Sequence, residues 1–280
     1  MMPVAMLAMH CLIVAGLGGE QEYEQRFTAQ AQTLDQLLHQ AGPDVKSQAL
    51  YGPAATLEHI RASLRDIANF AVPADTVMVV LIGHGSVDGM EYKFNIPGPD
   101  LTGSELASLL DQVKAQRQIV VNTTSASGAS TEVLEHPNRV VITATRSGTE
   151  KNATVFARYW IDALRDAASD TDKNEVINTA EAFKYAEQKT KQFYDTQKRL
   201  ATEHPTMTPP DVRIAVLRIG SVQQAAQRPE KQELLAKREE LERQIDDLKL
   251  RKASLPTEEY RKQLQAMLID LAKTQAEIDK

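Results

Sequence analysis

The groups in this sequence that are best placed to do chemistry are one imidazole and one cluster of hydroxyls. His84 lies between two glycines, directly after an apolar run at residues 77–82. Ser125 lies in a hydroxyl-rich segment, residues 123–128, that follows a second predicted strand at residues 118–122. A hydroxyl nucleophile and an imidazole base form the pair that many acyl-transfer enzymes use. The two segments therefore predict a nucleophilic site, provided that the fold brings them together.

Two strands of one sheet must position these groups. Residues 77–82 form an unbroken apolar run between turn signals, which is typical of a strand buried on both faces of a parallel sheet. Residues 118–122, apolar at the three central positions, indicate another short buried strand. Because ligands bind at the carboxyl ends of strands in open α/β sheets, we expect His84 and Ser125 on adjacent loops at that edge. They should hydrogen-bond directly or through one water.

This order of motifs resembles the active-site signature of the legumain and caspase clan of cysteine peptidases, clan CD. The matching residues are the Gly-His-Gly around His84 and the Ser-Ala-Ser-Gly at residues 125–128, where legumain-type enzymes carry Cys-x-Ser-Gly. The likeness extends over roughly residues 10–220. It implies a caspase-like three-layer α/β sandwich, with a mostly parallel, six-stranded sheet and helices on both faces. It also assigns His84 to the catalytic histidine and Ser125 to the nucleophilic cysteine, which is absent here.

The resemblance also implies a set of substrate-binding residues around this pair. In the clan, the loop that follows the next strand contributes to the specificity pocket. The implied substrate contacts are Gly85, Ser127, Gly128, Thr145 and Arg146. Arg146 could bind a carboxylate of a ligand, or it could be a solvated arginine in a surface loop.

Serine in place of cysteine changes the expected chemistry. A thiol has a pKa near that of histidine, so the two can exist as a thiolate and an imidazolium. A serine hydroxyl must instead lose its proton during attack, which requires an oriented imidazole and an oxyanion hole. The nearest carboxylate in sequence that could orient His84 is Asp88. Three hypotheses follow: an inactive or weakly active relative that binds a peptide or protein partner, a hydrolase that uses Ser125, and a cysteine enzyme whose nucleophile has been replaced.

The remainder of the first 220 residues alternates strand and helix patterns, which predicts a sheet covered on both faces. We expect further strands at residues 10–15, 46–51, 139–144 and 212–220. We expect helices at residues 22–40, 56–70, 104–113, 152–168 and 179–198, and a surface loop at residues 86–101. His204, in an irregular segment, is either a second candidate imidazole or a histidine in a surface turn.

An acidic connection at residues 170–181 resembles an EF-hand calcium loop. The ligands would be Asp170, Asp172, Asn174, Val176 through its carbonyl, Asn178 and Glu181. Glu175 replaces the usual glycine, and a residue with a Cβ in that left-handed conformation costs about 1–2 kcal/mol. We therefore expect weak calcium binding that affects stability, and no required cofactor. A solvated acidic cap between two helices is the alternative.

Composition limits the partners and the location of the protein. A net charge of −6 and a pI near 5.6 argue against nucleic acid as a partner. The single cysteine, Cys11, is interpreted as a small core residue. The apolar residues 1–16 resemble a signal peptide but lack a basic start, which leaves export to the periplasm or medium and a cytoplasmic location both open. No stretch approaches the roughly 20 apolar residues that span a bilayer, so we expect a soluble protein without a membrane span.

The chain changes character after Gly220, its last glycine. Two helical patterns rich in charge follow, separated by a break at residues 254–257. The second has apolar or small residues in a 4-3 rhythm: Tyr260, Leu264, Met267, Leu271, Thr274 and Ile278. We therefore expect an α/β domain at residues 1–220 and a helical hairpin or coiled coil at residues 221–280, through which the protein could associate with itself.

Overall fold

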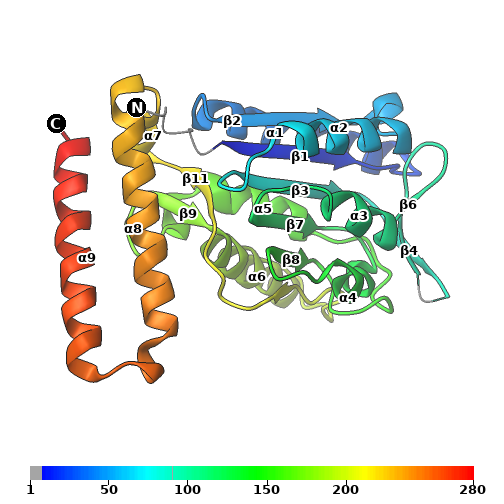
Figure 1. Ribbon diagram of the computed structural model, residues 1–280. Coiled ribbons are helices and arrows are strands. Elements are labelled where there is room, and N and C mark those ends of the chain that lie inside the picture. Colours follow the sequence, from blue (N-terminus) through cyan, green and yellow to red (C-terminus); the bar gives the residue numbers. More distant parts are fainter. Residues whose placement is uncertain (1–7, 90) are drawn as a thin grey trace. The chain divides into compact units, whose positions relative to one another are not determined.

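The computed structural model describes residues 8–89 and 91–280. One compact unit, Ala8–Leu217, is built around a six-stranded sheet with the strand order β10-β8-β7-β3-β1-β2 (Figure 1). These strands are β1 (Met9–Ala15), β2 (Val45–Leu50), β3 (Thr76–Ile82), β7 (Arg117–Asn122), β8 (Arg139–Thr143) and β10 (Thr206–Thr208). All neighbours are parallel except β10, which runs antiparallel to β8. The prediction of an α/β fold with a mostly parallel, six-stranded sheet is confirmed.

The apolar run at residues 77–82 forms β3, in the interior of the sheet. Every residue of β3 is buried, as is every residue of β1 and β8. Val79 in β3 lies in register with Leu12 of β1 on one side and Val120 of β7 on the other. An interior strand with both faces covered needs apolar side chains at successive positions, which is why the run lacks a polar alternation.

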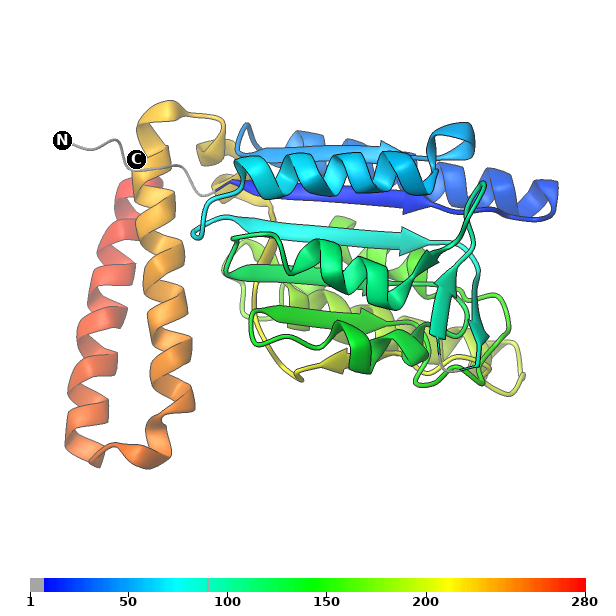
Figure 2. The same cartoon turned by 45° about the vertical axis from the view of Figure 1, so that its right-hand side comes forward.

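Helices cover both faces of the sheet (Figure 2). One face carries α2 (Leu57–Phe70), α3 (Gly103–Leu110) and α4 (Thr131–Leu134), and the other carries α1 (Gln21–Ala41), α5 (Phe156–Arg165) and α6 (Thr179–Thr196). The chain passes from β1 to β2 through α1 and returns to β3, on the other side of β1, through α2. Right-handed crossovers in opposite directions place the two helices on opposite faces. Thr56 caps α2 as expected, since its side chain accepts from the backbone N–H of His59.

The segment after His84 is not the expected surface loop. It forms a second, antiparallel sheet of β4 (Gly85–Asp88), β5 (Glu91–Phe94) and β6 (Leu101–Thr102). Tyr92 and Phe94 are buried, whereas Glu91 and Lys93 are partly exposed. This period-two alternation on four residues outweighs the turn-forming glycines and prolines around it.

The last strand of the main sheet was also wrongly assigned. We expected residues 212–220, but the sixth strand is β10, within the irregular, proline-rich segment. The predicted residues contain β11 (Ala215–Arg218), which pairs with β9 (Val176–Asn178) instead. Antiparallel pairing of three residues at a sheet edge needs no apolar run, so the sequence pattern did not reveal it.

Helix α5 begins four residues later than expected because a distant carboxylate caps it. Glu203 accepts hydrogen bonds from the backbone N–H groups of Val155 (2.7 Å) and Phe156 (3.2 Å). These are donors that the first turn of a helix cannot satisfy internally. Glu203 is 47 residues away from Phe156 in the chain, so the start of the helix could not be read locally. Short 3-10 turns complete the unit: η1 (Gly52–Ala54), η2 (Ser127–Ser130) and η3 (Ala167–Ser169).

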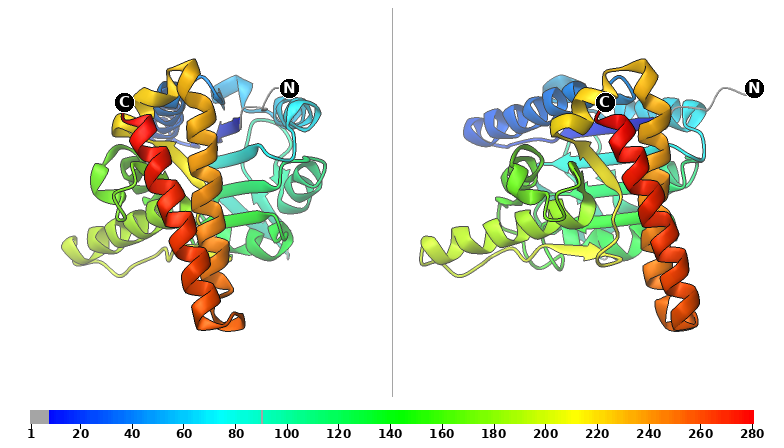
Figure 3. Two further views of the ribbon diagram at one scale, coloured as in Figure 1. Left: turned by 60° about the vertical axis from the view of Figure 1, so that its left-hand side comes forward. Right: turned by 90° about the vertical axis from the view of Figure 1, so that its left-hand side faces the viewer.

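The second unit contains Arg218–Lys280. Its helices are α7 (Gly220–Ala226), α8 (Gln232–Leu250) and α9 (Thr257–Ile278), with 3-10 turns η4 (Pro229–Lys231) and η5 (Lys252–Ser254). The two long helices pack side by side as an antiparallel pair, in agreement with the expected helical hairpin (Figure 3). The Lys231 ammonium joins the open end of the pair, donating to the carbonyls of Ile278 (2.7 Å) and Glu277 (3.1 Å). In residues 8–89 and 91–280, no helix combines the length and the hydrophobicity that a membrane span requires.

Candidate functional site

The fold brings the two predicted loops together. β3 and β7 are neighbours, with Leu81 in register with Asn122, so the segments that follow them leave the same edge of the sheet. The Ser125 hydroxyl accepts a hydrogen bond from the backbone N–H of Gly85 (3.1 Å) and donates one to the Gly85 carbonyl (2.9 Å). Ser125 therefore touches the residue directly after His84.

Gly85 is glycine because the loops approach so closely. A Cβ at this position would lie 2.5 Å from the Ser125 carbonyl oxygen and 2.6 Å from Thr124 Oγ1. Real Cβ atoms do not approach backbone oxygens this closely, so any side chain would force the loops apart. The second glycine of the Gly-His-Gly motif thus has a packing reason that holds whether or not the site is catalytic.

The His84 ring faces helix α1. Its centroid lies 4.9 Å from that of Tyr23 and 5.1 Å from that of Phe27, in edge-to-face arrangements. Burial lowers the pKa of His84; a hydrogen bond with the Gly18 backbone opposes this, and the nearby Arg26 guanidinium adds to it. The imidazole is therefore neutral near pH 7. In the part of the chain that the structure describes, no hydrogen bond joins it to Ser125.

The hydroxyls around Ser125 are buried and hydrogen-bonded to one another. Ser125 itself is only 2% exposed. Thr124 Oγ1 lies 2.6 Å from the Tyr92 hydroxyl and donates to Asn122 Oδ1 (2.8 Å), while Asn122 Nδ2 donates to Ser130 Oγ (3.1 Å). A network with satisfied members stabilises a buried polar loop and holds it in one conformation. This accounts for most of the hydroxyl cluster without invoking catalysis.

The other residues assigned to substrate binding divide into buried and exposed members. Ser127 and Thr145 are completely buried and bond to each other: the Thr145 N–H donates to Ser127 Oγ at 3.1 Å. Gly128 packs closely against the loop at Arg146 and donates its N–H to Thr145 Oγ1 (2.9 Å). Arg146 is 65% exposed, and its Nε lies 3.3 Å from Glu150 Oε1. The carboxylate that Arg146 pairs with is therefore in its own chain.

Sequence reasoning missed one carboxylate at this edge. Glu150 Oε1 lies 2.5 Å from His204 Nδ1, and its carbonyl accepts from the N–H of Ala126, next to Ser125. A carboxylate-oriented imidazole thus lies beside the serine loop, but it is His204 and not His84 that is oriented. The expected orienter, Asp88, forms an ion pair with Lys93 at 2.7 Å. No local signal identified Glu150, because 54 residues separate it from His204.

The acidic loop brings three of its predicted ligands together. The carboxylate oxygens of Asp170, Asp172 and Glu181 lie within 4.8 Å of one another. Glu175 has φ = 62°, the left-handed conformation expected where the usual loop has glycine, and its N–H donates to Asp170 Oδ2 (3.0 Å). Burial, and then the charge of Glu181, raise the pKa of Asp172, as expected for carboxylates held close together.

The remaining predicted ligands of this loop serve the fold. The Asn178 side chain caps α6 and forms a reciprocal capping box with Glu181. Asn174 Oδ1 accepts from the N–H of Val176 (2.8 Å). Asp172 forms an ion pair with Arg213 (3.2 Å), which compensates part of the negative charge.

Comparisons with known proteins give structural likeness only. No protein-family model matches the sequence, and no curated protein matches it. The structure is similar to the Drosophila initiator caspase Dronc, with 12% identity over 75% of this chain and 82% of that chain and a TM-score of 0.49. It is also similar to Chaetomium thermophilum Raptor (12% identity, 59% of this chain, 19% of that chain, TM-score 0.40) and to a structural-genomics protein of Geobacter sulfurreducens (9%, 71%, 92%, 0.47). At these values the likeness carries no argument about activity.

Proposed function

We propose that this chain is a caspase-like domain that binds a peptide or protein partner and has little or no peptidase activity. One observation supports the proposal most: the Ser125 hydroxyl is buried, and both its donor and its acceptor capacity are directed at the Gly85 backbone. A serine nucleophile has to reach its substrate and pass its proton to a base. Ser125 does neither in this arrangement.

Two further groups that catalysis would need have other partners. The Gly85 N–H is a natural oxyanion donor beside the serine, but it donates to Ser125. The His84 ring would have to leave Tyr23 and Phe27 to reach the hydroxyl. Hydrolysis would therefore require rearrangement of both loops.

The same edge has the features of a binding surface. It is the carboxyl edge of an open, mostly parallel sheet, where ligands bind in such folds. It presents the partly exposed His84 and His204 imidazoles and the exposed Arg146. These are side chains that recognise carboxylates and backbone carbonyls of an extended peptide.

A hydrolase that uses Ser125 is the second candidate. It is favoured by the contact between the two loops and by the lowered pKa of His84, which leaves the imidazole free to accept a proton near pH 7. A fluorophosphonate probe separates the two proposals. We expect the wild type and Ser125→Ala to be labelled equally. Labelling of the wild type that disappears in both Ser125→Ala and His84→Ala would overturn the non-catalytic proposal.

We also propose that the acidic loop at residues 170–181 binds calcium weakly. The proposal rests on the close approach of three carboxylates and on the left-handed Glu175. Such binding would stabilise the connection between α5 and α6 and would take no part in chemistry at Ser125. The native state would gain stability as calcium is added, since an ion that binds only the folded state raises its melting temperature.

A further inference from the structure

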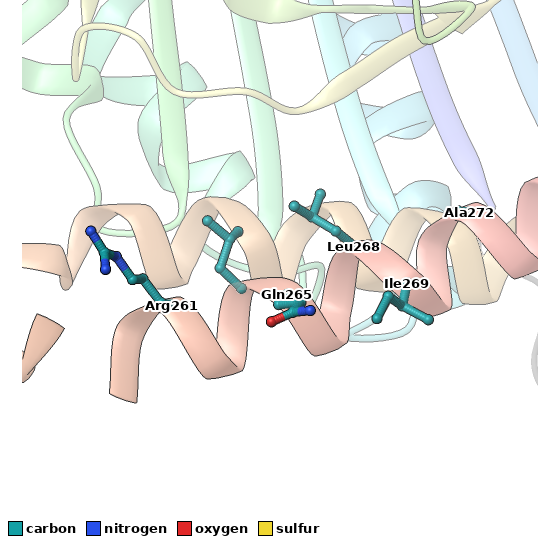
Figure 4. Close-up of a pocket in the computed structure, with 6 residues that line it drawn as sticks. Arg261, Gln265, Leu268, Ile269 and Ala272 are labelled. Carbon is teal, nitrogen blue, oxygen red and sulfur yellow. The ribbon is translucent and has the colours of Figure 1, made fainter. Parts of the chain in front are cut away.

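Helix α9 has a second apolar face besides the one in its 4-3 rhythm. In the 4-3 set, Thr274 and Ile278 are buried and the other members are half-buried, which leaves the opposite side of the helix for solvent. Yet Leu268 and Ile269 lie outside that set and are 47% and 46% exposed. They lie in a shallow groove of about 340 Å³ lined by Arg261, Leu264, Gln265, Leu268, Ile269 and Ala272. Figure 4 shows these side chains along α9.

We propose that this α9 face, formed by the six residues that line the groove, binds the same face of a second copy of the chain with the two α9 helices antiparallel. The positions are spaced 3, 1, 3, 1 and 3 residues apart, a pattern that is unchanged when it is read backwards. A two-fold interface needs such a self-complementary surface, because each residue meets its counterpart in the reverse order. Antiparallel pairing places Gln265 opposite Leu268 of the second copy, near the centre of the face.

The charges beside the α9 face fit this orientation. Glu258 and Lys273 lie on the same flank of the helix, on the side of Ile269. In the antiparallel register they come within about 3 Å of the same height along the axis, since each residue advances a helix by 1.5 Å. Glu258 is 88% exposed, and its ion pair with Arg261 is long, at 3.5 Å. Within residues 8–89 and 91–280, Lys273 has no ion pair, so both groups can pair across the two-fold axis.

A parallel arrangement fits less well. In a parallel two-fold pair each flank of one helix faces the other flank of its partner, and Glu258 and Lys273 share one flank 15 residues apart, so the two charges would not meet. The face of a single helix is smaller than the roughly 1,200 Å² that stable interfaces bury, so we expect a weak, concentration-dependent dimer.

Sedimentation velocity of the full chain tests the surface. Between about 1 and 500 µM we expect a reversible monomer–dimer equilibrium. Leu268→Lys should weaken it at least about tenfold, because an ammonium would be buried in each half of the interface. The matched control is Ala266→Lys, which adds the same charge at an exposed site about 200° around the helix from Leu268. Circular dichroism verifies that both variants are folded.

Charge reversal and cysteine pairing test the orientation. Glu258→Lys should weaken the dimer, and Glu258→Lys combined with Lys273→Glu should restore it. When Gln265→Cys and Leu268→Cys proteins are mixed and oxidised, the mixed disulfide should form in preference to either homodimer; Cys11 is buried and should not interfere. A wild type that is monomeric throughout, a dimer that Leu268→Lys leaves unchanged, or preferential Leu268→Cys homodimers would each overturn the proposal. None of these outcomes depends on whether Ser125 is a nucleophile.

Discussion

Ser125 and Gly85 are joined by two reciprocal hydrogen bonds, through which one side-chain hydroxyl serves both the N–H and the C=O of a single residue. The contact links the loops that follow β3 and β7 and directs the hydroxyl proton, which Ser125 would have to pass to a base during attack, at the Gly85 carbonyl. It also places the serine against the backbone of the motif that contains His84, and not against the His84 imidazole. This relationship determines the chemical behaviour that we expect of the site.

Ser125→Cys should produce a thiol whose reactivity depends little on His84. The imidazole is packed against Tyr23 and Phe27, so it should not draw the proton from a thiol at position 125. We expect iodoacetamide to modify this cysteine at rates that differ by less than about threefold between Ser125→Cys and Ser125→Cys with His84→Ala. Cys11, whose pKa is raised by burial, should remain unmodified in both proteins. A rate that falls tenfold or more without His84 would instead identify a catalytic pair.

Gly85→Ala should destabilise the α/β unit by about 2–4 kcal/mol, because the added Cβ would clash with the Ser125 carbonyl and Thr124. Urea unfolding provides the measurement. Gly89→Asn is a suitable control, since Gly89 has open space around its Cα and asparagine tolerates its positive φ. Equal losses in the two variants would show that the loops at Gly85 separate easily.

Glu203 should make stability fall as the pH rises. Burial raises the pKa of Glu203 from the ordinary 4.5 to about 7, so the folded state holds its proton more tightly than the unfolded state does. This contribution is fully present below about pH 4.5 and is lost as the pH rises through about 7, and it amounts to about 3 kcal/mol. We expect the difference in unfolding free energy between wild type and Glu203→Gln to change by that amount across the window. A difference that does not vary with pH would show that Glu203 titrates normally.

Calcium binding should depend on the conformation of Glu175. Glycine adopts φ = 62° without strain, so Glu175→Gly should stabilise the protein by up to about 1–2 kcal/mol and strengthen calcium binding. Differential scanning fluorimetry with millimolar calcium, and with magnesium as a control, measures both effects. Asp172→Asn, which removes one of the three clustered carboxylates, should abolish the calcium-dependent shift. If calcium leaves the melting temperature of wild type and of Glu175→Gly unchanged, the loop does not bind calcium and only connects two helices.

A chain that ends near Gln224 should keep a folded α/β unit, because Ala8–Leu217 has its own core. Loss of the helical hairpin should also abolish the concentration-dependent dimer. Far-UV circular dichroism and a cooperative melting curve measure the first expectation, and sedimentation velocity measures the second. Loss of cooperative unfolding would place the hairpin within the folding unit of the sheet.

Local patterns along the chain were sufficient for most of the fold. The apolar runs at β1, β3 and β8 identify interior strands because such strands are buried on both faces, and α2, α8 and α9 follow from helical spacing. The left-handed conformation of Glu175 could be anticipated as well, because Glu175 takes the position at which a calcium loop usually has glycine. The patterns were misleading where pairing is short or at an edge. β10 is held by pairing with the distant β8, which leaves only a weak local signal, and β4, β5 and β6 are short strands whose alternation is interrupted by turn-forming residues.

The orientation of side chains at the site required the three-dimensional structure. The sequence predicted that His84 and Ser125 follow adjacent strands, and they do. It could not predict that α1 packs its aromatic residues on His84, that Gly85 takes both hydrogen bonds of Ser125, or that Glu150 orients His204. These contacts join residues 40 to 61 positions apart, so no pattern along the chain records them. Spacing along a chain specifies which loops meet, whereas the direction of each side chain depends on everything packed around it.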